Sequence, residues 1–128
     1  MAWLRILYVC TGNSFRSAVA EALTRRFRPE LEVESAGVDA AEEIAGNAER
    51  FLAEEEAEKY VKPSPDQVSE RAVDQADVVV AMTEGHADFL REKFDVENLE
   101  VWDVRDPVEP GVEPRKVFEE IKQKVRGL

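Results

Sequence analysis

The chain has 128 residues, a hydrophobic fraction of 44% and a formal net charge of −11 at pH 7. This length favours a single domain over residues 1–128. The acidic balance argues against nucleic acid or an anionic membrane as the main partner, and no apolar run approaches the roughly 18 residues of a membrane span. One cysteine and the lack of an apolar leader at the N-terminus predict a cytoplasmic protein without an internal disulfide.

Patterns of strand and helix alternate from the start of the chain. Residues 4–9 form a short apolar run that predicts a buried strand, and residues 17–27 carry apolar side chains at helical spacing. Residues 31–35 alternate between apolar and charged side chains, which is typical of a half-buried edge strand. Ala36 and Gly37 are expected to end this strand.

The middle of the chain is strongly acidic and has the weakest patterns. We predict one helix over residues 42–60, with a break near Gly46 as the alternative. Ser64, Pro65 and Gln67 resemble a capping box with proline at the first helical position, which predicts a further helix from there.

The last third of the chain returns to clear patterns. Residues 77–82 predict a second buried strand, Thr83 is a candidate N-cap for a helix over residues 84–94, and residues 99–102 predict a short fourth strand. The final helix has an apolar face made of Val117, Phe118, Ile121, Val125 and Leu128.

Alternating strands and helices predict an α/β fold with right-handed crossovers. Strongly apolar strands are buried on both faces, so the first and third strands should be central and the second and fourth peripheral. The expected fold is a doubly wound four-stranded parallel sheet of order 2-1-3-4, with helices on both faces. Ligands bind such sheets beyond the carboxyl ends of the strands, where the loop after the first strand lies.

That loop carries the strongest chemical signal. Cys10 and Arg16 stand at its two ends, so a thiol and a guanidinium can share one tetrahedral oxyanion. A helix N-terminus and an arginine both favour the thiolate form, and the hydroxyl of Ser17 can donate to it. We expect the substrate to be bound by the whole loop, which consists of Thr11, Gly12, Asn13, Ser14, Phe15, Arg16 and Ser17.

The backbone of the loop also suits an anion. Gly12 permits positive φ and close approach of the backbone, and Asn13 tolerates the left-handed region. Together they predict a nest of inward-pointing amides. The alternative is a buried structural cysteine beside a surface arginine, and the combination of residue types at these spacings argues against it.

Attack of a thiol on a phosphate ester also requires an acid for the leaving group. Asp106, followed by Pro107, comes just after the fourth strand and should face Cys10 across the carboxyl edge of the sheet. Asp103 is the rival, and we interpret it as a turn residue.

Residues 9–17, with the sequence Val-Cys-Thr-Gly-Asn-Ser-Phe-Arg-Ser, resemble the signature loop of low-molecular-weight protein tyrosine phosphatases. They are equally similar to the loop of the related thioredoxin-coupled arsenate reductases. The similarity continues through residues 35–37, 76–82 and 106–107, and is weakest over residues 39–74.

The resemblance implies a cysteinyl-phosphate mechanism without metal or organic cofactor. Cys10 would be the nucleophile, Arg16 the phosphate clamp, and Asp106 the acid and then the base. Asn13 and Ser17 would belong to the network that holds the loop. The expected partner is a phosphorylated protein or a small aryl phosphate, and the expected state is a monomer or weak dimer.

Three departures from the family pattern keep alternatives open. Phe15 stands where many members have a second cysteine, and either supplies a ring to the pocket or packs under the loop. Val108 and Glu109 replace the usual aromatic side chains after Asp-Pro, which leaves tyrosine specificity open. The chain also lacks the further cysteines of arsenate reductases, so arsenate reduction would need an external thiol, and a silent anion-binding protein is the third reading.

Three other side chains have no predicted catalytic part. The only histidine, His86, is interpreted as a polar residue in the first turn of a helix. Trp3 and Trp102 flank strand ends and are expected to pack at the core or its rim, with a place for Trp102 in the pocket as the alternative.

Overall fold

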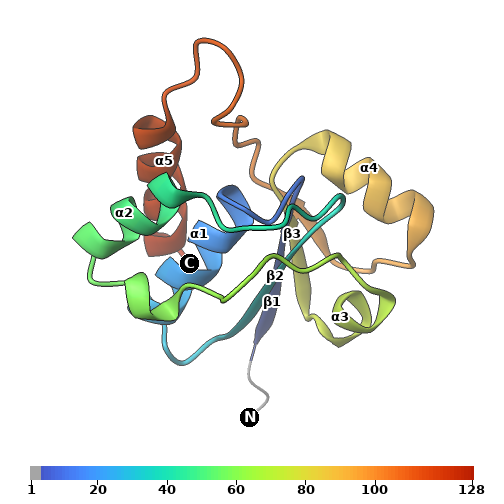
Figure 1. The fold of residues 1–128 in the computed structure, drawn as a ribbon. Helices are drawn as coiled ribbons and strands as arrows, with labels where there is room; N and C mark the ends of the chain where they lie inside the picture. The colour runs from blue at the N-terminus through green and yellow to red at the C-terminus, as the bar shows by residue number, and fades with distance from the viewer. Residues whose placement is uncertain (1–3) are drawn as a thin grey trace.

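The computed structural model describes residues 4–128, so Trp3 lies outside the described residues. Four parallel strands form one sheet of order β2-β1-β3-β4, which confirms the predicted 2-1-3-4 topology (Figure 1). The central strands are the two apolar ones, as expected. The strands are β1 (Arg5–Cys10), β2 (Glu32–Gly37), β3 (Val78–Ala81) and β4 (Leu99–Val101).

Helices cover both faces of the sheet. One face is covered by α1, α2 and α5, and the other by α3 and α4 (Figure 1). None of the helices in residues 4–128 is long and apolar enough to cross a membrane. The helices are α1 (Arg16–Phe27), α2 (Gly46–Glu54), the short 3₁₀ helix η1 (Glu58–Tyr60), α3 (Glu70–Gln75), α4 (Glu84–Lys93) and α5 (Pro114–Arg126).

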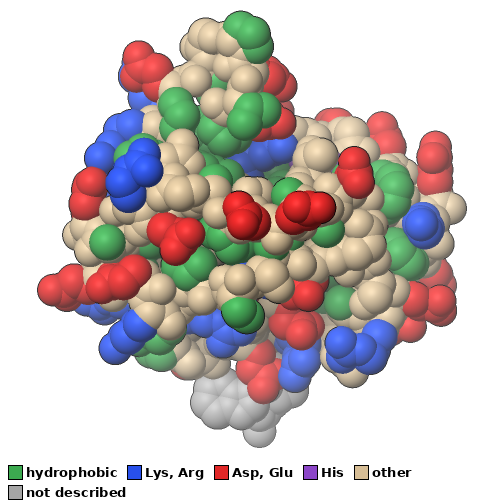
Figure 2. Space-filling view, viewed as in Figure 1, with side chains coloured by type: hydrophobic (Ala, Val, Ile, Leu, Met, Phe, Trp, Pro, Cys, Tyr) green, Lys and Arg blue, Asp and Glu red, His purple; other side chains and the backbone are tan. Residues whose placement is uncertain are grey.

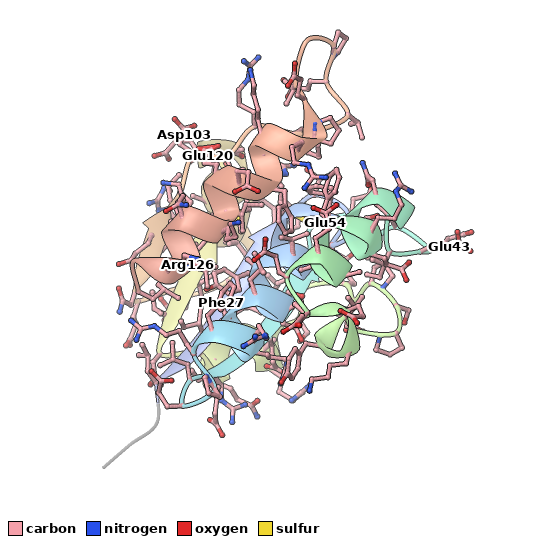
Figure 3. The ribbon with its side chains drawn as sticks, turned by 90° about the vertical axis from the view of Figure 1, so that its left-hand side faces the viewer. Phe27, Glu43, Glu54, Asp103, Glu120 and Arg126 are labelled. Carbon is pink, nitrogen blue, oxygen red and sulfur yellow. The ribbon has the colours of Figure 1, made fainter. Side chains whose placement is uncertain are left out.

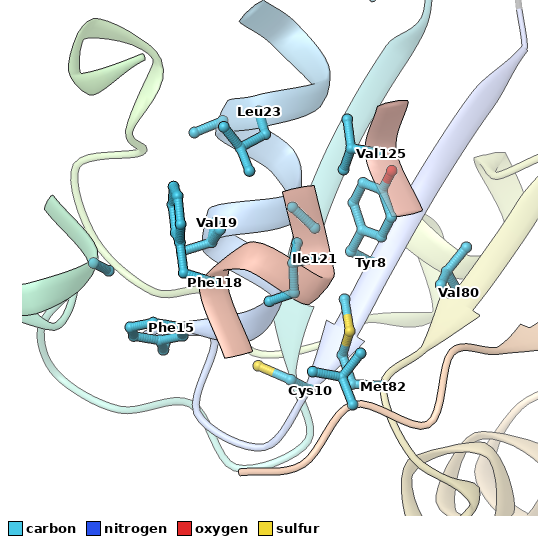
Figure 4. Close-up of a cluster of buried hydrophobic side chains, with 14 of the residues drawn as sticks. Tyr8, Cys10, Phe15, Val19, Leu23, Val80, Met82, Phe118, Ile121 and Val125 are labelled. Carbon is cyan, nitrogen blue, oxygen red and sulfur yellow. The ribbon is translucent and has the colours of Figure 1, made fainter. Parts of the chain in front are cut away.

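Strand β1 divides its side chains between two cores, because successive residues of a strand point to opposite faces. Tyr8 and Cys10 face the core under α1 and α5 (Figure 4). Leu7 and Val9 face the core under α3 and α4. Cys10 therefore ends a central strand on the same side of the sheet as α1, the helix that follows it.

Helix α5 closes the first core by packing against α1. Its buried side chains are the predicted apolar face, apart from Leu128, which is only partly buried: Val117, Phe118, Ile121 and Val125. At the far end, the guanidinium of Arg126 lies 4.7 Å from the ring centre of Phe27 on α1, and both are seen from the side in Figure 3. Trp102 packs on the ring of Tyr8 with ring centres 5.2 Å apart, so it packs at the rim of the core as expected and does not line the pocket.

The single helix predicted over residues 42–60 is wrong. Helix α2 begins only at Gly46, and the chain leaves it through Glu56, whose φ of 56° is incompatible with continued helix. Before α2, the backbone is held along the Cys10 loop instead. The amide of Ala41 donates to the carbonyl of Gly12 at 2.9 Å, and that of Ala45 to the carbonyl of Ser14 at 3.0 Å.

The helix predicted to start at Pro65 is also wrong. This segment is extended and forms a short parallel bridge with the end of β2, through Gly37 and Gln67. The amide of Gly37 donates to the carbonyl of Asp66 at 2.8 Å. The helix starts later, at α3, where Ser69 is the N-cap and accepts from the amide of Ala72. Backbone pairing with β2 thus overrides the local capping signal.

Candidate active site

The loop between β1 and α1 lies at the carboxyl end of the sheet (Figure 1). Gly37, the last residue of β2, packs directly against it. A Cβ atom at Gly37 would lie 2.5 Å from the carbonyl oxygen of Thr11 and 2.9 Å from the amide nitrogen of Asn13. Only glycine therefore allows the loop to sit this close to β2. The sequence predicted only that Gly37 lies at the end of the strand, and not that it contacts the loop.

The left-handed residue of the loop is Asn13, which tolerates this region as expected, whereas Gly12 does not adopt the positive φ that it permits. Asn13 has a φ of 55°, and among the glycines of residues 4–128 only Gly111 has positive φ. Asparagine adopts this conformation more readily than most residues because its short side chain can form local hydrogen bonds. Here that side chain is fully buried and extensively hydrogen-bonded.

Two polar groups lie against the sulfur of Cys10, whose residue is only 2% exposed. The Oγ atom of Ser17 lies 2.9 Å from Sγ, and the backbone N–H of Asn13 donates to Sγ at 3.3 Å. Such donors stabilise negative charge on a sulfur atom. The predicted contact between Ser17 and Cys10 is therefore present in the structure.

Arg16 is held with its guanidinium at the mouth of the loop and is only 4% exposed. Nη1 donates to the carbonyl of Val104 at 2.9 Å, and Nη2 donates to Oγ1 of Thr11 at 3.4 Å. Nη2 also lies 3.5 Å from Oδ2 of Asp106. These three contacts fix the plane of the guanidinium before any ligand arrives, which lowers the cost of ordering it.

The start of α1 adds a second source of positive potential. Within residues 4–128, no side chain accepts a hydrogen bond at this helix end, and the first turn contains no acidic residue. The unpaired amides and the helix dipole therefore remain available to an anion. The positive potential is confined to this end of α1, since carboxylates are spread across the face of the molecule shown in Figure 2.

Asp106 and Cys10 line the same pocket, which has a volume of about 230 Å³. The segment after β4 projects beyond the sheet and brings Asp106 to this edge (Figure 1). The Asp106 side chain is 30% exposed, and its Oδ1 accepts from the amide of Val108 at 3.1 Å. The residues that line the pocket are Cys10, Thr11, Gly12, Ser14, Phe15, Arg16, Ala45, Asn47, Asp106, Pro107 and Val108.

The walls of the pocket are mainly aliphatic or polar. Val108 is 84% exposed and stands at the mouth. Phe15 contributes an edge of the wall but is only 7% exposed, and it lies among the buried side chains in Figure 4. Its ring meets that of Phe51 edge-on at 6.2 Å. Phe15 therefore packs mainly under the loop. Asp103 is an exposed residue with a φ of 56° in the irregular segment after β4, and it lies outside the pocket.

Lys62 also contacts the loop, although no sequence pattern indicated it. Its Nζ donates to Oδ1 of Asn13 at 2.6 Å and to the carbonyl of Ser35 at 2.8 Å. It also forms an ion pair with Asp66 at 2.7 Å. Lys62 belongs to the acidic, weakly patterned part of the chain, where neither spacing nor periodicity relates it to position 13.

His86 also touches the loop, although its position in the first turn of α4 was predicted correctly. Its Nε2 lies 2.8 Å from Oγ1 of Thr11, and its Nδ1 lies 3.0 Å from Oγ1 of Thr83, the predicted N-cap of α4. Burial lowers the pKa of His86 to about 4, with a further lowering by the nearby charge of Arg16. His86 is therefore neutral at pH 7.

Ser14 anchors the other side of the loop. Its Oγ donates to the carbonyl of Glu43 at 2.8 Å, while the Glu43 side chain points away from the body of the molecule (Figure 3). This bond fixes the segment that precedes α2 against the loop, so the wall formed by Ala45 and Asn47 is held beside Cys10.

The chain is similar to known proteins in sequence and in overall fold. A protein-arginine-phosphatase of Geobacillus stearothermophilus is 44% identical over 93 residues, which cover 70% of this chain and 62% of that protein. A low molecular weight protein tyrosine phosphatase from T. tengcongensis superimposes with a TM-score of 0.85 at 26% identity, over 96% of this chain and 95% of that one. An arsenate reductase from Archaeoglobus fulgidus superimposes with a TM-score of 0.77 at 29% identity, over 95% of this chain and 96% of that one.

The matched stretch thus spans less than two thirds of that first relative's own length. The match to a family model is longer than the match to this relative and covers nearly the whole chain. The model described as low molecular weight phosphotyrosine protein phosphatase matches residues 5–128. The chain therefore belongs to the low molecular weight phosphotyrosine protein phosphatase family.

Proposed function

We propose that this chain hydrolyses phosphorylated protein side chains through a cysteinyl-phosphate intermediate. The observation that carries the proposal is the pocket that unites Cys10, Arg16 and Asp106, a thiol, a guanidinium and a carboxyl group from distant parts of the chain. A small oxyanion seated in the loop would meet all three.

In the first step, Sγ of Cys10 attacks phosphorus and the bond from phosphorus to the leaving oxygen breaks. Asp106 donates its proton to that oxygen, so the substrate leaves as a neutral alcohol or phenol. Arg16 and the amides at the start of α1 hold the non-bridging oxygens and stabilise the charge of the transition state.

In the second step, water attacks the phosphocysteine. Asp106, now a carboxylate, accepts the proton of that water, the P–S bond breaks and inorganic phosphate forms. Cys10 leaves as a thiolate, which Ser17 stabilises through the contact between Oγ and Sγ at 2.9 Å. Both steps balance with water as the only added reactant.

The family and the solved tyrosine phosphatase from T. tengcongensis favour phosphotyrosine as the substrate side chain. The direct test is metal-free hydrolysis of p-nitrophenyl phosphate and of phosphotyrosine peptides, with phosphoserine peptides for comparison. Substitution Cys10→Ser should abolish turnover because serine is a poor nucleophile here. Wild-type rates in this variant would exclude the proposed intermediate.

Phosphoarginine is a second candidate, for two reasons. The relative with 44% identity is named a protein-arginine-phosphatase. The pocket mouth also offers Val108 and Asn47 where a phenol ring would gain from aromatic faces, and Phe15 is largely buried beneath the loop. The ratio of kcat/KM for matched phosphoarginine and phosphotyrosine peptides decides between the two substrates.

Arsenate reduction is the remaining alternative, because of the likeness to the Archaeoglobus fulgidus protein. With a single cysteine in the chain, it would have to consume an external thiol. Arsenate-dependent oxidation of added glutathione would support it, and a lack of glutathione consumption would exclude it.

A further inference from the structure

We propose that Lys62 is a positioning residue that sets the direction of the hydrogen bonds reaching the nucleophilic sulfur. The inference deepens the phosphatase function proposed above and rests on it. Lys62 does not line the pocket that holds Cys10, so it acts through Asn13. The side chain of Lys62 is only 9% exposed, and its ammonium group lies against the phosphate-binding loop.

The orientation of the Asn13 amide is fixed by groups that can only donate. Oδ1 accepts from the ammonium of Lys62 at 2.6 Å and from the backbone N–H of Asp66 at 2.9 Å. Neither donor can accept a hydrogen bond, so the carbonyl end of the amide must face them. The NH₂ end must therefore point the other way, where Nδ2 donates to Ser17 at 2.8 Å and to Ser35 at 2.9 Å.

The same reasoning fixes the hydroxyl of Ser17. Its oxygen accepts from Nδ2 of Asn13 at 2.8 Å, so its hydrogen must go to another acceptor. Two acceptors are in reach, Sγ of Cys10 at 2.9 Å and the carbonyl of Ala36 at 3.4 Å, and the shorter contact favours the sulfur. The chain of donors therefore runs from the Lys62 ammonium through Asn13 and Ser17 to the sulfur. Linked hydrogen bonds of this kind polarise one another, and the charge at Lys62 strengthens the last one.

The surroundings of Lys62 keep the ammonium at this point. It pairs with Asp66 at 2.7 Å and donates to the carbonyl of Ser35. The Ser35 hydroxyl in turn donates to Glu21, whose other oxygen accepts from Nε of Arg25 at 3.1 Å. The ammonium of Lys62 is thus held by Asp66 and the Ser35 carbonyl, in the position from which it donates to Oδ1 of Asn13.

The consequence falls on both chemical steps. A stronger donor at the sulfur stabilises negative charge there, both when the sulfur attacks phosphorus and when it leaves the phosphocysteine. The contribution is made at the sulfur and not at the substrate, so removing it should lower kcat more than it changes KM.

The first test uses Lys62→Met, which removes the charge but keeps a long side chain, and Lys62→Arg, which keeps the charge. Lys59→Met is the matched control, since Lys59 is exposed and belongs to the same segment. Cys10 is the only cysteine, so the rate of iodoacetamide alkylation reports on one sulfur. All rates are recorded below the unfolding transition of each variant.

In Lys62→Met, we expect the pH of half-maximal alkylation to rise by about one unit and kcat to fall about tenfold. Lys62→Arg should lie between Lys62→Met and the unchanged protein, and Lys59→Met should match the unchanged protein. An unchanged alkylation profile in Lys62→Met would overturn the proposal.

The second test repeats Lys62→Met in a Ser17→Ala background. If the effect passes through Ser17, the second substitution should add almost nothing to the alkylation shift. An equal shift in both backgrounds would show that Lys62 acts without the relay and would overturn the proposal. Alkylation needs no substrate, so this result stands apart from the phosphatase assay. Lack of hydrolysis by the unchanged protein would count against the proposed function alone.

Discussion

The two sides of the pocket are built in different ways. On the loop side, Asn13 and Ser17 are fully buried, Arg16 is 4% exposed, and each makes several hydrogen bonds. On the acid side, the side chain of Asp106 is 30% exposed and Val108 is 84% exposed. The side that holds the proposed nucleophile is buried and hydrogen-bonded, and the side proposed to meet the substrate is exposed. We infer that the first side holds the nucleophile and the oxyanion, while the second side supplies the acid and selects the substrate.

The largest expected effect tests the acid side. Asp106→Asn removes the proton donor and should lower kcat by roughly 10²–10⁴-fold on phenyl phosphate, whose leaving group needs a proton. The loss on p-nitrophenyl phosphate, which has a much better leaving group, should be smaller. Steady-state rates on the two esters measure the difference. Equal losses on both would mean that Asp106 is not the acid.

The next effect tests the rigidity of the loop side. Gly37→Ala places a Cβ 2.5 Å from the carbonyl oxygen of Thr11, so the loop must move. We expect a loss of about 1–3 kcal/mol in the free energy of unfolding, together with a loss of activity of about tenfold or more. Urea titration and kcat measure the two effects. Gly46→Ala is the control, because its Cβ would approach only the end of Arg50, at 3.7 Å.

His86 gives the loop side a pH dependence with a defined sign. Its pKa is about 4 in the folded protein, while an unfolded histidine has a value near 6.5. Below pH 6.5 the unfolded chain therefore binds a proton that the folded chain does not. The free energy of unfolding should fall as the pH drops from 6.5 to 4, by about 3 kcal/mol at most from this group.

The measurement is urea titration at several pH values for the unchanged protein and for His86→Gln. The variant cannot take up this proton, so its stability should depend less steeply on pH across that window. Identical slopes in the two proteins would mean that His86 titrates alike in the folded and unfolded states.

The smallest effect tests the open side again. Val108→Ser changes an exposed side chain at the pocket mouth, so it should leave the free energy of unfolding within about 0.5 kcal/mol. We expect kcat/KM for peptide substrates to change by a few fold, with kcat for p-nitrophenyl phosphate unchanged. A large fall in kcat on that small ester would mean that the mouth also supports the chemistry.

Much of the fold was predictable because each strand can be recognised from its own short stretch of sequence. The apolar strands and the Cys10 loop lie in continuous stretches, and the rule that buried parallel strands are central gave the sheet order. The helix predicted over residues 42–60 failed because amides of that segment pair with Gly12 and Ser14. The helix predicted from Pro65 failed because the chain pairs with Gly37 at the end of β2. Pattern and propensity carry no information about such distant partners.

The sequence by itself determined the reactive groups and their order. Cys10, Arg16 and Ser17 lie within one short loop, so the local path from strand to helix is enough to bring them together. Asp106 needed only the parallel sheet, which places the loops after β1 and β4 at one edge.

Only the tertiary structure decided what holds those groups in place. Gly37, Lys62 and His86 come from three separate segments, and each touches the loop through a contact that depends on the packed fold. A buried polar group must find its partner wherever the chain brings one within hydrogen-bond distance. That partner is set by three-dimensional packing, so the supports of the loop appear only once the chain is folded.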